Sequence, residues 1–135
     1  TSSIIWPDRF TMIQPLLVFV GGGLGAVARF GLSKLVGATV TSGFPWPTLT
    51  VNLLGALFIG LFAGFEEMRG GNPPLRLLIV TGMLGGFTTF SAFSLESALL
   101  FQRGDYVNLG LYVGISLLGT VLLVFAGSAV MRQFG

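Results

Sequence analysis

The chain has 135 residues, of which 53% are hydrophobic and only 9% are charged. A soluble domain carries about 25% charged residues, so this composition indicates a protein whose outer surface faces lipid. Cysteine and histidine are absent and no basic run occurs, which excludes disulfides, the usual zinc, haem and Ser-His-Asp sites, and an evident nucleic-acid surface.

Residues 1–12 form a short, mixed N-terminal tail that lacks the apolar stretch and cleavage site of a signal peptide. Residues 13–135 are predicted to form a single all-α transmembrane domain with four spans, because a span needs about 20 apolar residues. The predicted spans run from about Ile13 to Val36, from Pro47 to Phe65, from Leu75 or Leu77 to Phe101, and from Tyr106 to Met131.

The basic residues at the span ends carry only a weak orientation signal. Four spans place both termini on the same side of the membrane. One side carries Arg9, Arg69, Arg76 and Arg132, and the other carries Lys34 and Arg103. The positive-inside rule therefore gives a small bias, which fits either one fixed orientation or insertion in both orientations.

Glycine is abundant, with 21 residues, and several pairs have GxxxG spacing. Such pairs let helix backbones approach closely in lipid. We expect them to serve packing within one subunit and also self-association. The pairs are Gly21/Gly25, Gly60/Gly64, Gly82/Gly86 and Gly110/Gly114.

The middle of the third span is unusual. Residues 81–91 contain three glycines followed by two adjacent threonines, which make a poor continuous helix. A break at this depth would expose main-chain oxygens that must face protein, water or a cation. The alternative is a continuous helix with a glycine-packed face.

Phenylalanine and serine residues follow this segment at helical spacing. Phe90 and Phe93 share one face, and Ser91 and Ser94 form a neighbouring small polar face. A phenylalanine ring has a positive edge that can face an anion without binding it tightly, although such rings more often face lipid or pack.

Other polar residues lie within the apolar spans. Asn52 is costly in a span unless it bonds to a neighbouring helix or faces a pathway, where its NH₂ group could donate to an anion. Tyr112, Ser116 and Thr120 recur every four residues and draw one polar stripe along the fourth span. Hydroxyl groups can replace water around an ion of either sign, so the stripe predicts a path without naming the ion.

Arg29 is the only cation deep in a span. It would favour nearby anions in a vestibule, or else bond to carbonyl groups at a helix end. No acidic residue lies at mid-depth, which argues against a proton-coupled cation exporter.

Three of these segments together resemble the Fluc family of fluoride channels, also called CrcB proteins. Residues 21–29 (GGGLGAVAR) are similar to the family's first-helix motif, and residues 48–55 (TLTVNLLG) to its second. Residues 85–94 (GGFTTFSAFS) are similar to its third and most specific motif. The resemblance covers nearly the whole chain from Gly21 onward.

The resemblance implies an antiparallel, dual-topology homodimer with two pores in the bacterial inner membrane. It also implies passive, fluoride-selective export that relieves fluoride toxicity. By position, the pore residues would be Asn52, Phe90, Phe93, Ser91, Ser94, Tyr112, Ser116 and Thr120. The carbonyl groups of Gly85 and Thr88 would hold a structural sodium ion at the dimer centre. Ala92 stands where many relatives carry threonine, so no role for that hydroxyl is carried over.

Two other functions fit a chain with four spans. A small multidrug transporter also forms an antiparallel dimer, but it uses a glutamate within its first helix, where this chain has Arg29 and no acid. A non-conducting membrane scaffold protein is disfavoured only by the polar stripe and by the glycine-threonine segment.

Overall fold

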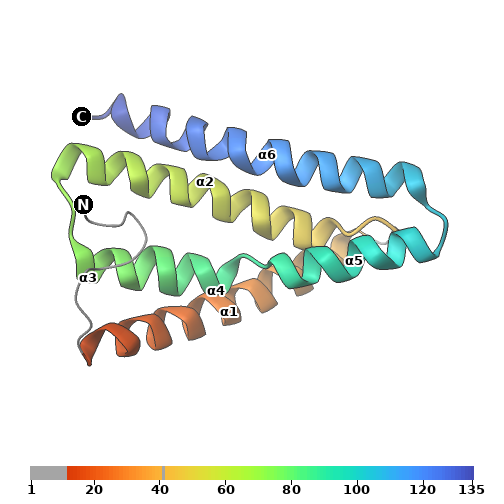
Figure 1. Cartoon of the computed structure of the whole chain (residues 1–135), viewed down its shortest axis with the longest axis horizontal. Coiled ribbons are helices and arrows are strands. Elements are labelled where there is room, and N and C mark those ends of the chain that lie inside the picture. The colour runs from red at the N-terminus through yellow and green to blue at the C-terminus, as the bar shows by residue number, and fades with distance from the viewer. Residues whose placement is uncertain (1–11, 41) are drawn as a thin grey trace.

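The computed structural model describes residues 12–40 and 42–135 (Figure 1). In these residues the chain forms only helices, joined by short connections. The elements are α1 (Ile13–Thr39), α2 (Trp46–Arg69), α3 (Pro73–Arg76), η1 (Leu77–Leu84), α4 (Gly85–Phe87), α5 (Phe90–Gln102) and α6 (Tyr106–Arg132).

The short elements α3 to α5 follow one another and together make one span, Pro73–Gln102. With α1, α2 and α6, the described chain thus has four helices long and apolar enough to cross a membrane, as predicted. The predicted tail and Arg9 lie outside the described residues, except for Met12, which precedes α1.

Helix α2 extends four residues beyond its predicted end at Phe65. The predicted span stops before the charged residue Glu66, yet Glu66 is only 9% exposed and forms an ion pair with Arg76 at the start of the third span. A paired carboxylate can remain against the protein, so the helix continues to Arg69. There Gly70, with a φ of 77°, takes up the left-handed backbone of the turn.

The third span is broken, as the sequence indicated. Helix α4 ends at Phe87, and Thr88 and Thr89 have extended backbones with ψ angles of 158° and 119°. The Thr89 hydroxyl then accepts a hydrogen bond of 3.2 Å from the Ala92 N–H, so it caps the start of α5. The segment η1 just before the break is π-helical, a feature that the sequence did not predict.

Glycine backbones form two close seams within the subunit. A Cβ atom on Gly25 would lie 2.8 Å from the Met83 carbonyl carbon. The backbones of α1 and the third span are therefore in close contact at this point. A Cβ atom on Gly60 would lie 2.9 Å from the Val124 carbonyl carbon, so the backbones of α2 and α6 are also in close contact. The glycine pairs of α1 and α2 therefore pack within one subunit. A Cβ atom on Gly110 or Gly114 would meet no described atom of this subunit within 4 Å.

The α1 seam gives a matched test. We expect Gly25→Ala to lower the free energy of unfolding by about 3 kcal/mol, at the upper end for overpacking, because the added methyl group meets main chain that cannot rotate away. Gly23→Ala, whose Cβ atom meets nothing within 4 Å, should stay close to wild type. Thermal unfolding in detergent measures both, and equal midpoints would contradict the seam.

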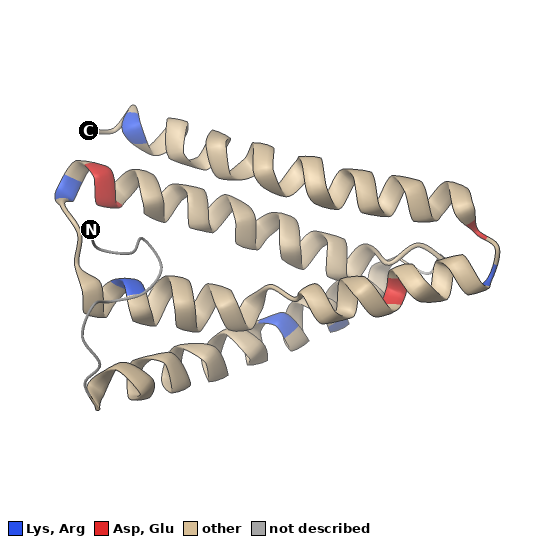
Figure 2. Cartoon of the chain, in the orientation of Figure 1, with Lys and Arg blue, Asp and Glu red and all other residues tan. Residues whose placement is uncertain are grey.

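The charged residues of α2 and α6 lie only at the ends of these helices, whereas α1 and α5 carry charge farther in (Figure 2). At the end where α2 turns into α3, Arg132 bonds to Glu67 at 2.9 Å. Together with the pair of Glu66 and Arg76, this contact ties the ends of α6 and the third span to α2.

Candidate ion pathway

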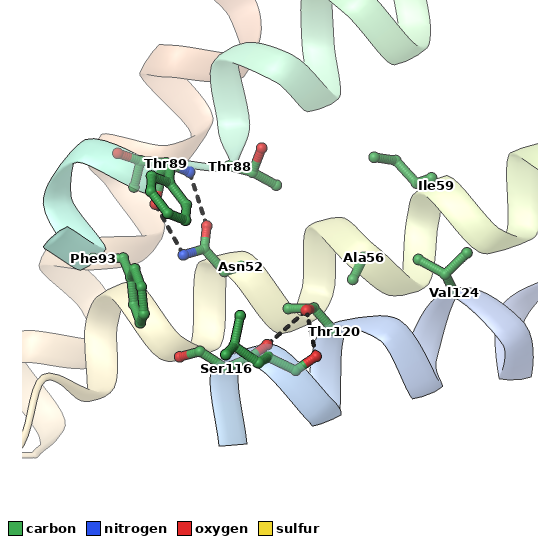
Figure 3. A pocket seen from close by; sticks show the side chains of 11 residues that line it. Asn52, Ala56, Ile59, Thr88, Thr89, Phe93, Ser116, Thr120 and Val124 are labelled. Carbon is green, nitrogen blue, oxygen red and sulfur yellow. Dashed lines mark hydrogen bonds between the residues drawn. The ribbon is translucent and has the colours of Figure 1, made fainter. Parts of the chain in front are cut away.

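A groove of about 320 Å³ runs beside the break, between α2, α5 and α6 (Figure 3). One of its walls consists of Asn52 and the two threonines of the break, another of phenylalanines, and a third of hydroxyl-bearing residues of α6. The lining residues are Asn52, Ala56, Ile59, Thr88, Thr89, Phe90, Phe93, Ser116, Leu117, Thr120 and Val124.

Asn52 holds the unwound backbone with both ends of its amide. Its NH₂ group donates to the Thr89 carbonyl at 3.0 Å, and its Oδ1 atom accepts from the Thr89 N–H at 2.8 Å (Figure 3). The interhelical hydrogen bond considered from the sequence is thus present. An amide NH₂ group has two hydrogens, so one remains for the groove that Asn52 lines.

The break diverts the helical partners of two carbonyl groups. In a continuous helix the Thr89 N–H would bond to Gly85 and the Ala92 N–H to Thr88. Here those N–H groups bond to the Asn52 side chain and to the Thr89 hydroxyl. The Gly85 and Thr88 carbonyl oxygens, the two predicted cation ligands, therefore lack these partners.

Arg29, on α1, bonds to the helical turn just before the break. Its Nε atom donates to the Gly86 carbonyl at 3.1 Å, which is the second of the two roles considered from the sequence. Arg29 does not line the groove beside the break but a separate one between α1, α2 and α5.

The two predicted phenylalanines line the groove side by side. Their ring centroids are 5.4 Å apart, and Phe90 is 74% exposed in the single subunit. The ring of Phe93 also lies 5.2 Å from that of Tyr112, which in turn lies 5.7 Å from Phe44. Phe93 is thus held on one side by packing, while Phe90 projects from the subunit.

Two members of the polar stripe on α6 reach the groove. The Thr120 hydroxyl donates to the Ser116 carbonyl at 2.6 Å, so its own hydrogen is already used. Ser116 is only 7% exposed. Among the described residues, its Oγ is the only buried side-chain nitrogen or oxygen atom without a hydrogen-bond partner. The Ser116 hydroxyl thus has a hydrogen that no described protein group accepts.

Three predicted pore residues do not line this groove. Ser91 and Ser94 are exposed on α5, and the Ser91 hydroxyl lies 3.2 Å from that of Thr89. Tyr112 is fully buried, and its hydroxyl donates to Glu96 at 2.7 Å.

Glu96 is a further site residue, and it was not predicted from the sequence. Its carboxylate accepts hydrogen bonds from the hydroxyl groups of Tyr112, at 2.7 Å, and Thr48, at 2.8 Å. It thereby joins α5 to α6 and α2 beside the ring of Phe93. One feature of the sequence could have indicated this role. Glu96 lies six residues before the end of α5, and an ionised side chain inside a span needs partners.

The amino-acid sequence matches one protein family. The family model described as "CrcB-like protein, Camphor Resistance (CrcB)" matches residues 16–128. A relative from Rhizobium etli named "Fluoride-specific ion channel FluC" is 47% identical over 122 residues, which cover 90% of this chain and 98% of the relative. Relatives of the same name from Methylobacterium nodulans and Sphingopyxis alaskensis are 46% and 48% identical, covering 92% and 86% of this chain and 100% and 93% of their own.

Proposed function

Because this chain belongs to the CrcB family, we propose that it is a passive, fluoride-selective ion channel. It is a multi-pass membrane protein of a channel family and not an enzyme. In the bacterial inner membrane it would let accumulated fluoride leave the cell and so relieve fluoride toxicity.

The observation that carries this proposal is the groove beside the helix break. Fluoride is small and strongly hydrated, so a path must replace its water with hydrogen-bond donors. The Asn52 amide and the unpartnered Ser116 hydroxyl supply such donors, and the edges of Phe90 and Phe93 supply weak positive potential. Among the described residues no lysine or arginine lines the groove, which favours binding weak enough for release.

The proposed working unit is an antiparallel homodimer with a pore on each side. Support comes from what a single subunit leaves uncovered, since Phe90 is 74% exposed and Gly85 at the break is exposed as well. A second copy placed across the break would cover both and would close the open side of the groove. The open space around Gly110 and Gly114 would also admit a neighbouring helix.

A structural sodium ion at the dimer centre is part of the proposal. The diverted hydrogen bonds leave the Gly85 and Thr88 carbonyl groups without their helical partners, and unwound carbonyl groups of this kind suit Na⁺. Two such breaks that meet across a dimer axis would offer four oxygens. A bound cation there would add positive potential beside each groove.

The direct test is efflux from liposomes that contain the purified protein. Liposomes loaded with fluoride should empty rapidly, while chloride-loaded liposomes should empty no faster than protein-free ones. Retention of fluoride, or equal loss of chloride, would overturn the channel assignment. Drug-driven proton uptake would indicate the multidrug-transporter alternative instead.

Dual topology has its own prediction. The chain has no cysteine, so a single Gly71→Cys substitution, in the turn after α2, gives one labelling site in open space. In cells, a membrane-impermeant thiol reagent should label about half of this cysteine from outside, and Gln102→Cys at the other end should behave alike. If one site labels fully and the other not at all, the chain has one orientation.

A further inference from the structure

A second groove, of about 300 Å³, lies between α1, α2 and α5, on the α1 side of the bundle. Its α1 wall carries two cations, Arg29 and Lys34, and its α5 wall carries Glu96. Within the described chain, neither cation forms a salt bridge, whereas Arg76 and Arg132 both do. The charged side chains lining the groove thus sum to +1, and the fluoride pathway described above does not use this charge.

By helix length, the Lys34 end of the groove falls near the depth of lipid headgroups, whereas its Arg29 and Thr89 end lies deeper. Helix α1 has 27 residues and is therefore about 40 Å long, some 10 Å more than the hydrocarbon core of a bilayer. Lys34 is five residues from the end of α1, so its backbone lies within a few Å of the hydrocarbon boundary. Pro47, close to the start of α2, lines the same groove and places it at that end of the bundle.

The side chains present both polar and apolar surface in the groove. The Lys34 ammonium lies 5.6 Å from the centre of the Phe30 ring, so it leans back along the helix towards the groove rather than out to the water. The Ser33 hydroxyl lines the groove beside it. Phe30, which is 64% exposed, adds apolar surface next to these polar groups.

We propose that this groove binds the headgroup of an anionic phospholipid. The phosphodiester would bond to the Lys34 ammonium and the Ser33 hydroxyl, and the glycerol backbone would lie on Phe30. Arg29 adds positive potential from deeper in the groove, with its Nε atom already bonded to Gly86. A singly charged anionic lipid neutralises the net charge of +1, whereas a zwitterionic lipid adds none, so basic pockets between spans select the former.

Native mass spectrometry of the purified protein in neutral detergent tests this binding. We expect dioleoyl phosphatidylglycerol to remain bound and dioleoyl phosphatidylcholine to dissociate. Lys34→Gln should lower phosphatidylglycerol binding about fivefold, the factor typical of one basic residue at an anionic surface. Ser33→Ala should also lower it, without a change of charge.

Arg69→Gln is the matched control. Arg69 also stacks on an aromatic ring, with its guanidinium 5.8 Å from the centre of Phe65. It forms no salt bridge with any residue that the structure describes, and it does not line this groove. Its loss should leave phosphatidylglycerol binding unchanged. An equal fall in both charge variants, equal binding of phosphatidylcholine, or displacement by millimolar fluoride or inorganic phosphate would each overturn the proposal. Displacement would identify the groove as a free-anion site.

Discussion

Replacing Phe93 with isoleucine is expected to lower the rate of fluoride efflux from liposomes by about tenfold or more while the protein remains folded. The ring of Phe93 lines the groove between Phe90, at 5.4 Å, and Tyr112, at 5.2 Å. Isoleucine fills a similar volume but lacks the positive ring edge. Aromatic contacts are worth about 1 kcal/mol each, and about 1.4 kcal/mol on a barrier changes a rate tenfold.

The control for this substitution is Phe19→Ile on α1, where the ring is 79% exposed and does not line the groove. Its efflux rate should match wild type. Size-exclusion chromatography in detergent should show the same elution volume for both variants. Efflux at the wild-type rate from Phe93→Ile liposomes would make this ring a packing residue only.

Replacing Asn52 with alanine is expected to lower both stability and flux. The substitution removes two hydrogen bonds and leaves the Thr89 N–H and carbonyl without partners in a half-buried break. Groups left unsatisfied in this way cost about 1–3 kcal/mol each. We expect the free energy of unfolding to fall by roughly 3 kcal/mol, which thermal unfolding in detergent can measure.

Asn52→Asp separates the structural role from the pore role. Aspartate still accepts from the Thr89 N–H but cannot donate to the Thr89 carbonyl, so part of the lost stability should return. Flux should not return, because a negative charge beside the groove repels fluoride. Asn108→Ala, which removes a bond to Asp105 near the start of α6, should leave flux unchanged. A stable, fully conducting Asn52→Ala variant would contradict the role of Asn52 at the break.

Much of the fold could be predicted from the sequence, because a span depends on a long local run of apolar residues. The starts of the first and fourth spans, Ile13 and Tyr106, agree with the structure. The break was also accessible, since glycine and β-branched threonine act on the local backbone. The end of α2 was not accessible, because the partner of Glu66 is Arg76, which lies across a turn.

Several groove residues could be picked out from the sequence, but their hydrogen-bond partners could not. Asn52, Phe90 and Ser116 line one groove, and the sequence singles out each of them as a candidate pathway residue. The sequence could not show that Tyr112 turns away to Glu96, because that choice depends on how α5 and α6 pack. The π-helical stretch of η1 likewise has no local sequence signal. The N–H of Gly85, the residue that follows η1, donates to the Val80 carbonyl five residues back.

The two glycine seams also determine when the subunit can assemble during synthesis. The seam of α1 needs Met83 in the third span, and the seam of α2 needs Val124 near the chain's end. The seam glycines of α1 and α2 are therefore not buried against each other. Until a later helix is inserted, they remain exposed to lipid. Synthesis of α6 is thus required to complete the α2 seam, and a chain that stops before α6 leaves the glycine face of α2 uncovered.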